Sequence, residues 1–190
     1  MKMPPRTSAA VVLTVVLSVA TSVLAQPTTH TVTSDAQLRQ ALIDAVPGDT
    51  IAFGADITLT GDLPVIDGTL AIDGRGFTLS GANQYRGLMV IQGVELIPPV
   101  VVSISDLTIA DTLARGGAGG SGSLPGGGGA GLGGALYVGE NTIVAVENVT
   151  ILSSSAIGGS GGTFVEDTTA GGGGGMGGNG GNGGAGFFNG

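Results

Sequence analysis

The chain has no cysteine and no tryptophan, and its single lysine is Lys2. Without cysteine, neither a disulfide nor a thiolate zinc site is available. Beyond residue 25 there is no lysine, so the lysine-dependent phosphate loop of nucleotide-binding proteins is excluded. Basic residues are also few, since six stand against 14 acidic ones, for a net charge of −8. An acidic surface repels phosphate groups, so we expect no nucleic-acid partner.

The first 25 residues have the pattern of a signal peptide. Lys2 and Arg6 make a positive start, and an apolar stretch runs from Ala9 to Leu24. Compact residues then precede Gln26, where we expect cleavage. The apolar stretch is short for a membrane span. The sequence therefore predicts export of a mature chain that begins at Gln26 and does not insert directly into a membrane.

One amphipathic helix is expected, over Ser34 to Ala45. Ser34 is a good N-cap, and Gln37 completes a capping box three residues later. Pro47-Gly48-Asp49 ends the helix. We expect this helix to cover the first strands of a β-structure and shield them from edge-to-edge pairing. Its apolar face consists of Leu38, Ala41, Leu42 and Ala45.

Short strand-like phrases recur along the rest of the chain. Ile57 to Gly61 returns as Phe77 to Gly81 after 20 residues, and Ser105 to Ile109 returns as Glu147 to Ile151 after 42. Because 42 is about two such periods, we expect Leu107 and Val149 to lie in one core column, two coils apart. Recurrence at a fixed interval is typical of a solenoid, in which equivalent residues stack on one another. A sandwich or barrel shows similar turn spacing but does not need the same phrase to return. We therefore predict an all-β parallel β-helix of about four coils over residues 26–157, with Leu59 beside Leu79 in the core. The expected strands are 50–53, 57–60, 70–72, 77–80, 88–91, 100–103, 107–109, 135–138, 143–146 and 149–152.

Glycine is concentrated in the second half, where 30 of the 39 glycines follow Arg115. The segment 116–134 interrupts the expected strands, and residues 158–190 form a glycine-rich tail. Such segments bury little apolar surface to offset their chain entropy, so we expect both to be flexible and dispensable for the fold. A strand-like start at Ala185 to Phe188 leads us to expect a longer protein.

The sequence resembles one known group of proteins. Asp49 to Phe53, Leu70 to Gly76, Asp106 to Ile109 and Gly133 to Val138 resemble the N-terminal passenger region of autotransporter-like adhesins. These belong to the pectin-lyase-like right-handed parallel β-helices, and the resemblance covers residues 28–157. It implies a right-handed β-helix, export, and a location at the bacterial surface in association with the outer membrane.

No catalytic, cofactor-binding or metal-binding residue is predicted. Pectin-degrading relatives use acidic clusters with arginine or histidine, and the nearest set here is Asp62, Asp67, Asp73 and Arg75. Asp-Gly pairs among these are ordinary turn formers, so we interpret them as turns. The single histidine, His30, is expected to be exposed. Residues 158–162 match a serine nucleophile motif but lack its strand-to-helix context.

These features favour a non-catalytic, exported surface or adhesin-like protein, the N-terminal part of a longer passenger. Its expected partners are surface glycans or proteins. One alternative is the first part of a polysaccharide lyase or hydrolase whose active coils lie further along the chain. Another is a glycine-repeat cell-wall protein, because the Gly-Gly-Asn runs look like mycobacterial glycine-rich surface repeats.

Overall fold

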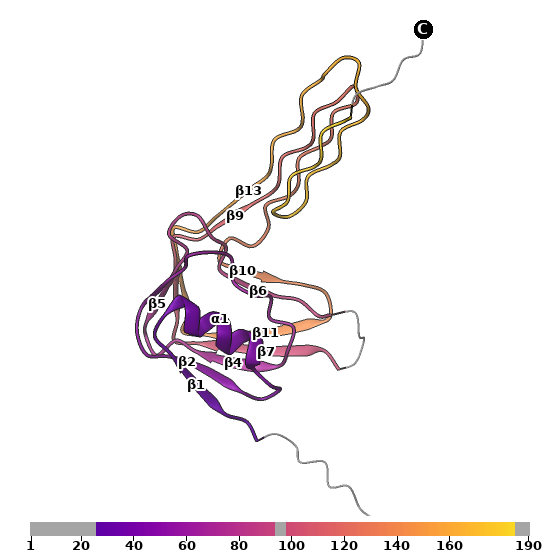
Figure 1. Ribbon diagram of the computed structural model, residues 1–190. Helices are drawn as coiled ribbons and strands as arrows, with labels where there is room; N and C mark the ends of the chain where they lie inside the picture. Colours follow the sequence, from indigo (N-terminus) through magenta and orange to yellow (C-terminus); the bar gives the residue numbers. More distant parts are fainter. Residues whose placement is uncertain (1–25, 94–97, 185–190) are drawn as a thin grey trace, which may run out of the picture.

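The computed structural model describes residues 26–93 and 98–184, which form a body of strands and a projecting rod of extended chain (Figure 1). The expected signal peptide, residues 1–25, and the strand-like start at 185–188 lie outside the described residues. Within the described ranges, no helix has both the length and the apolarity needed to cross a membrane.

The body consists of short strands and one helix, as the sequence predicts. The helix α1 (Asp35–Asp44) follows the first strand, β1 (Thr29–Val32). The expected strands are present with ends shifted by at most two residues, and β1, β9 and β13 were not foreseen. The remaining elements are β2 (Thr50–Phe53), β3 (Ile57–Thr58), β4 (Leu70–Asp73), β5 (Thr78–Ser80), β6 (Leu88–Val90), β7 (Val100–Ser105), β8 (Thr108–Ala110), β9 (Leu113–Arg115), β10 (Leu136–Val138), β11 (Thr142–Glu147), β12 (Thr150–Leu152) and β13 (Ser155–Ile157).

The strands form four sheets, and every strand pair among the described residues is parallel. The largest sheet has the order β1-β2-β4-β7-β11, and the second has the order β12-β8-β5-β3. Two further pairs are β10-β6 and β13-β9. Sequential strands do not form hairpins, so the antiparallel sandwich considered from the sequence is excluded. The all-β, parallel class is confirmed.

The 42-residue recurrence corresponds to one step between neighbouring strands. Glu147 pairs with Ser105, Thr150 with Thr108, and Ser155 with Leu113. Leu107 and Val149 therefore lie on adjacent layers, and the expectation that they are two layers apart is wrong. The interval is long because the glycine segment 116–134 leaves the body between β9 and β10.

The 20-residue recurrence is misaligned by two residues. Leu79 pairs with Ile57, at an interval of 22, and the Leu59 amide donates to the Ser80 carbonyl. Leu59 is thus not the partner of Leu79, although both are buried. Because side chains alternate along a strand, a shift of two residues keeps every apolar side chain on the same face. The pattern alone therefore cannot choose between the two registers.

The turn between the two large sheets explains why the Asp106 phrase recurs. Asp106 and Asn148 both have φ of 51°, in the left-handed region that Asn and Asp tolerate best among non-glycine residues. Their side chains also meet, since Asn148 Nδ2 donates to Asp106 Oδ1 at 3.0 Å. The corner residue is therefore stacked from one layer to the next.

Helix α1 seals the first layer of the body. The Ser34 hydroxyl accepts a hydrogen bond from the Gln37 amide, so the predicted N-cap is confirmed. Gln37 completes the cap on Thr33 rather than on Ser34. Leu38 and Leu42 are buried in the same core cluster as Phe53, and α1 lies against β1 and β2.

A buried carboxylate ties the N-terminal strand to this layer. Asp49 accepts hydrogen bonds from the Thr28 amide at 2.7 Å, the Val46 amide at 3.0 Å and His30 Nε2 at 2.9 Å. The Thr28 amide, followed by the Val46 amide and His30, lowers the pKa of Asp49 far below its usual range. His30 was expected to be exposed, but it is only half-exposed and bonded to Asp49.

The burial of Leu79 in the core leads to a first prediction, about the stability of the fold. Leu79 is fully buried between Ile57 and Ile109. Leu79→Ala should lower the free energy of unfolding by about 2–5 kcal/mol, since it leaves a cavity in a thin core. The control is Val101→Ala on the exposed face of β7, which should cost less than about 1 kcal/mol. Urea denaturation of both variants measures the difference, and equal losses would contradict this view of the core.

The lowered pKa of Asp49 leads to a second prediction, about how stability depends on pH. Its folded pKa is lowered, so its stabilising contribution is complete above the unfolded pKa of about 3.9 and is lost as the pH falls below that value. Asp49→Asn should be less stable than the parent protein at pH 7, and the gap should narrow between pH 5 and pH 2. The control Asp67→Asn removes an exposed carboxylate and should leave the parent pH profile in place. A constant gap at all pH values would show that the charge of Asp49 is unimportant.

Candidate functional site

The body has a sealed first layer and an open last one. Along one core column, Ile51, Ile72, Ile104 and Val146 pair in succession. The first three are at most 1% exposed, but Val146 is 56% exposed. A second column of Ile57, Leu79, Ile109 and Ile151 ends in the same way, with Ile151 at 54%. Side chains of the core type therefore face solvent in the last layer.

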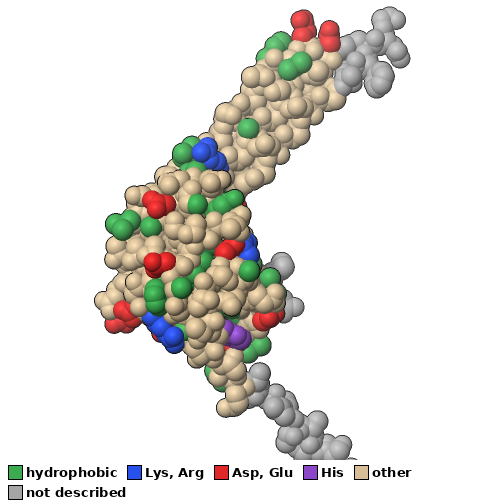
Figure 2. Space-filling view, turned by 60° about the vertical axis from the view of Figure 1, so that its left-hand side comes forward, with side chains coloured by type: hydrophobic (Ala, Val, Ile, Leu, Met, Phe, Trp, Pro, Cys, Tyr) green, Lys and Arg blue, Asp and Glu red, His purple; other side chains and the backbone are tan. Residues whose placement is uncertain are grey.

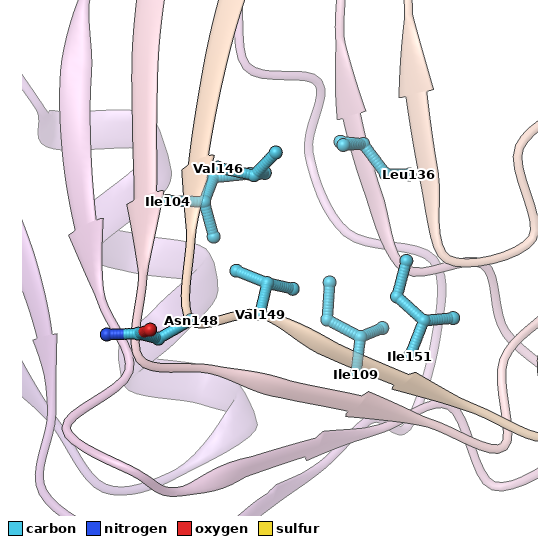
Figure 3. A pocket seen from close by; sticks show the side chains of 7 residues that line it. All are labelled: Ile104, Ile109, Leu136, Val146, Asn148, Val149 and Ile151. Carbon is cyan, nitrogen blue, oxygen red and sulfur yellow. The ribbon is translucent and has the colours of Figure 1, made fainter.

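This open end is hollowed. An open cavity of about 310 Å³ is lined by residues of the last two layers, and six aliphatic side chains face it while Asn148 stands at its edge (Figure 3). The strands of the last layer, β10 to β13, each have a neighbour on one side only among the described residues. A cavity with aliphatic walls and free strand edges suits further strands better than a polar ligand. The aliphatic lining is Ile104, Ile109, Leu136, Val146, Val149 and Ile151.

The second unusual region is the rod of extended chain, which we call the glycine arm and which consists of residues 116–134 and 158–184. The chain passes along it five times, and we number these passes as segments one to five. Figure 2 shows almost no apolar or charged side chains along its length. Its only charged residues, Glu166 and Asp167, lie in the turn between segments three and four, which is at the far end. The segments are 116–122, 125–134, 158–164, 169–175 and 178–184.

Backbone hydrogen bonds join the segments at every third residue. The amides of Gly117 and Gly120 donate to the carbonyls of Gly175 and Gly172, both at 2.7 Å. In a β-ladder, bonds to one neighbouring strand recur at every second residue. A repeat of three residues is that of the polyproline II helix, which has no internal hydrogen bonds and leaves its amides free for neighbours. The same spacing joins segment one to segment three, through the carbonyls of Ile157, Ser160 and Thr163.

Glycine is required at the contacts because the backbones approach very closely. A Cβ atom on Gly120 would lie 1.9 Å from the Gly181 carbonyl oxygen, and one on Gly162 would lie 2.0 Å from that of Gly120. In segment one, the two residues with side chains, Ala118 and Ser121, are three positions apart. The spacing of the side chains thus follows the three-residue turn.

This packing corrects the expectation for the glycine segments. Residues 116–134 and 158–184 are ordered extended chains rather than flexible excursions. The expectation counted apolar burial alone, whereas here one backbone satisfies the amides and carbonyls of the next. The serine of the Gly-x-Ser-x-Gly match, Ser160, lies within this packing, where its carbonyl accepts from the Gly119 amide.

The acidic residues weighed from the sequence do not form one site. Asp73 accepts from the Arg75 amide at 3.0 Å and from Arg75 Nε at 3.3 Å, within a single turn. Asp62 accepts from the Arg86 amide at 3.0 Å, and Asp67 is exposed in the loop before β4. Across residues 26–93 and 98–184, no group of three or more His, Asp or Glu residues is placed to hold a metal ion.

No family model, no curated protein and no solved structure matches this chain. The open end and the glycine arm therefore have to be interpreted from their own geometry.

The close packing of the segments leads to a third prediction, about alanine substitutions at two neighbouring glycines of the arm. Gly162→Ala should loosen the arm by about 1–3 kcal/mol, because the new Cβ meets the Gly120 carbonyl. Gly161→Ala is the matched control, since its Cβ would come no nearer than 3.7 Å to Gly126. Amide hydrogen exchange of arm glycines measures the change. Equal exchange in the two variants would mean that the close packing of the segments is unimportant.

Proposed function

We propose that this chain is the N-terminal part of an exported, non-catalytic surface protein, built as a right-handed parallel β-helix of the autotransporter adhesin kind. The observation that carries the proposal is the contrast between the two ends of the body. One end is covered by α1, and the other leaves Val146 and Ile151 exposed, although the three preceding strands bury the equivalent side chain in each column. Further strands can therefore extend the body at the open end, whereas α1 covers the other end.

The resemblance to adhesin passengers and the predicted signal peptide support a place outside the cell. The glycine arm supports the adhesin role, because its most exposed apolar side chains lie at the far end. Leu124 and Phe164 are 70% and 67% exposed there, and Val165 is next to Phe164. The bond from the Val165 amide to the Gly122 carbonyl places the turn of segment three beside segment one. A stiff arm with an apolar tip is suited to contact with another surface.

The proposal predicts export and binding. Protein recovered outside the cytoplasm should begin at or near Gln26 by N-terminal sequencing. Purified protein should bind at least one member of a panel of immobilised glycans and matrix proteins. A Leu124→Ser, Phe164→Ser double variant should bind at least about tenfold more weakly, since it removes the main apolar contacts of the tip. Val101→Ser on the body serves as the control.

Two results would count against the proposal. An intact Met1 in a soluble cytoplasmic pool would exclude export. The gene beyond codon 190 gives the second test, because further strands in phase with the open columns are expected there. Stacked acidic residues with arginine or histidine, together with cleavage of a polysaccharide, would favour the lyase or hydrolase alternative.

A further inference from the structure

Segment one is the centre of the glycine arm, and its amides donate in three directions. Because the polyproline II helix has three residues per turn, every third amide points the same way. One set of amides donates to segment four and a second set to segment three. The third set is formed by Ala118 and Ser121, and no backbone carbonyl among the described residues accepts from them.

Asparagine side chains accept the hydrogen bonds that segment one donates in this third direction. Asn179 Oδ1 accepts from the Ala118 amide at 2.8 Å, and Asn182 Oδ1 accepts from the Ser121 amide at 3.0 Å. Both asparagines belong to segment five, whose Gly180 amide donates to the Ala118 carbonyl. Segment five therefore lies beside segment one and reaches round it with two amide side chains. The asparagines occupy the place that the carbonyls of another chain would take.

Without the two asparagines, the Ala118 and Ser121 amides would form a row of free hydrogen-bond donors. We call this row a docking edge, because another extended chain could pair with it. Ser121 Oγ lies 2.8 Å from Thr163 Oγ1 of segment three, so the row is flanked by segments three and five. Ala118 and Ser121 are half-buried, in contrast to outer glycines such as Gly127, which are exposed. Half-buried amides without acceptors are costly, and a row of them at a regular spacing would pair with another extended chain.

We propose that Asn179 and Asn182 close the arm to lateral pairing with the arm of a second copy. A second copy supplies the matching partner, because the arm presents glycine backbone at this three-residue spacing. Only Glu166 and Asp167, at the tip, carry charge that would oppose such contact. The two asparagines thus play the part that charged or bulged residues play on the edges of β-sheets. This role is independent of the function proposed above.

The test replaces both asparagines, Asn179 and Asn182, in the full mature chain. In Asn179→Ala, Asn182→Ala, the Ala118 and Ser121 amides should exchange at least about tenfold faster in dilute solution, because they lose their acceptors. Gly117 and Gly120, which donate to segment four, are internal controls and should stay protected. Sedimentation over a range of concentrations should show a monomer for the parent protein and a reversible dimer for the variant.

Two further variants keep the test decisive. Asn179→Asp, Asn182→Asp retains an oxygen acceptor at each position and should keep the two amides protected. If the double alanine variant loses protection at Gly117 and Gly120 as well, Asn182→Ala alone provides the comparison, because it exposes only the Ser121 amide. Unchanged exchange at Ala118 and Ser121 would overturn the capping role. Fast exchange in a variant that stays monomeric at every concentration would overturn the docking edge.

Discussion

Hydrogen bonding between backbones of neighbouring extended chains is the interaction on which both halves of this molecule depend. In the body it runs between parallel strands, and apolar columns such as Ile51, Ile72 and Ile104 fill the space that the sheets enclose. In the arm it runs between glycine chains, with almost no side chains to bury. The hydrogen-bond spacing changes from two residues to three, and the side-chain content changes with it. A chain with few aromatics and no disulfide is thus ordered by its own main chain.

The sequence predicted the parts of the fold that depend on local chemistry. Ser34 caps the helix because its hydroxyl can reach the Gln37 amide, and this follows from residue type and spacing alone. The step of 42 residues was visible because the corner residues Asp106 and Asn148 have the same backbone requirement. The pairing of Leu79 was missed by two residues, because alternation defines the face of a strand and not its register. Register depends on how long each connection is, and sequence periodicity does not contain that information.

The candidate sites were harder to predict, for a physical reason in each case. The open end is visible only once the columns are known, since Val146 and Ile151 are aliphatic like their buried partners, Ile104 and Ile109. The order of the arm was missed because hydrophobic burial is the usual measure of what a segment gains on folding. Its signal was present in the spacing of residues with side chains. Ala118 and Ser121, Ser160 and Thr163, and Asn179 and Asn182 are each three apart.

The two regions manage exposed backbone in opposite ways. At the open end, free edges and apolar columns occur together, and under the proposed function further strands would pair with the edges and cover the columns. In the arm, the half-buried amides of Ala118 and Ser121 in segment one each donate a hydrogen bond to an asparagine side chain. Free polar backbone invites pairing with any extended chain, so a protein that leaves one edge open gains specificity by closing others. Under the proposed function, further strands extend the body from its open end. The arm instead closes its central segment with Asn179 and Asn182, and its most exposed apolar side chains, Leu124 and Phe164, lie at its tip.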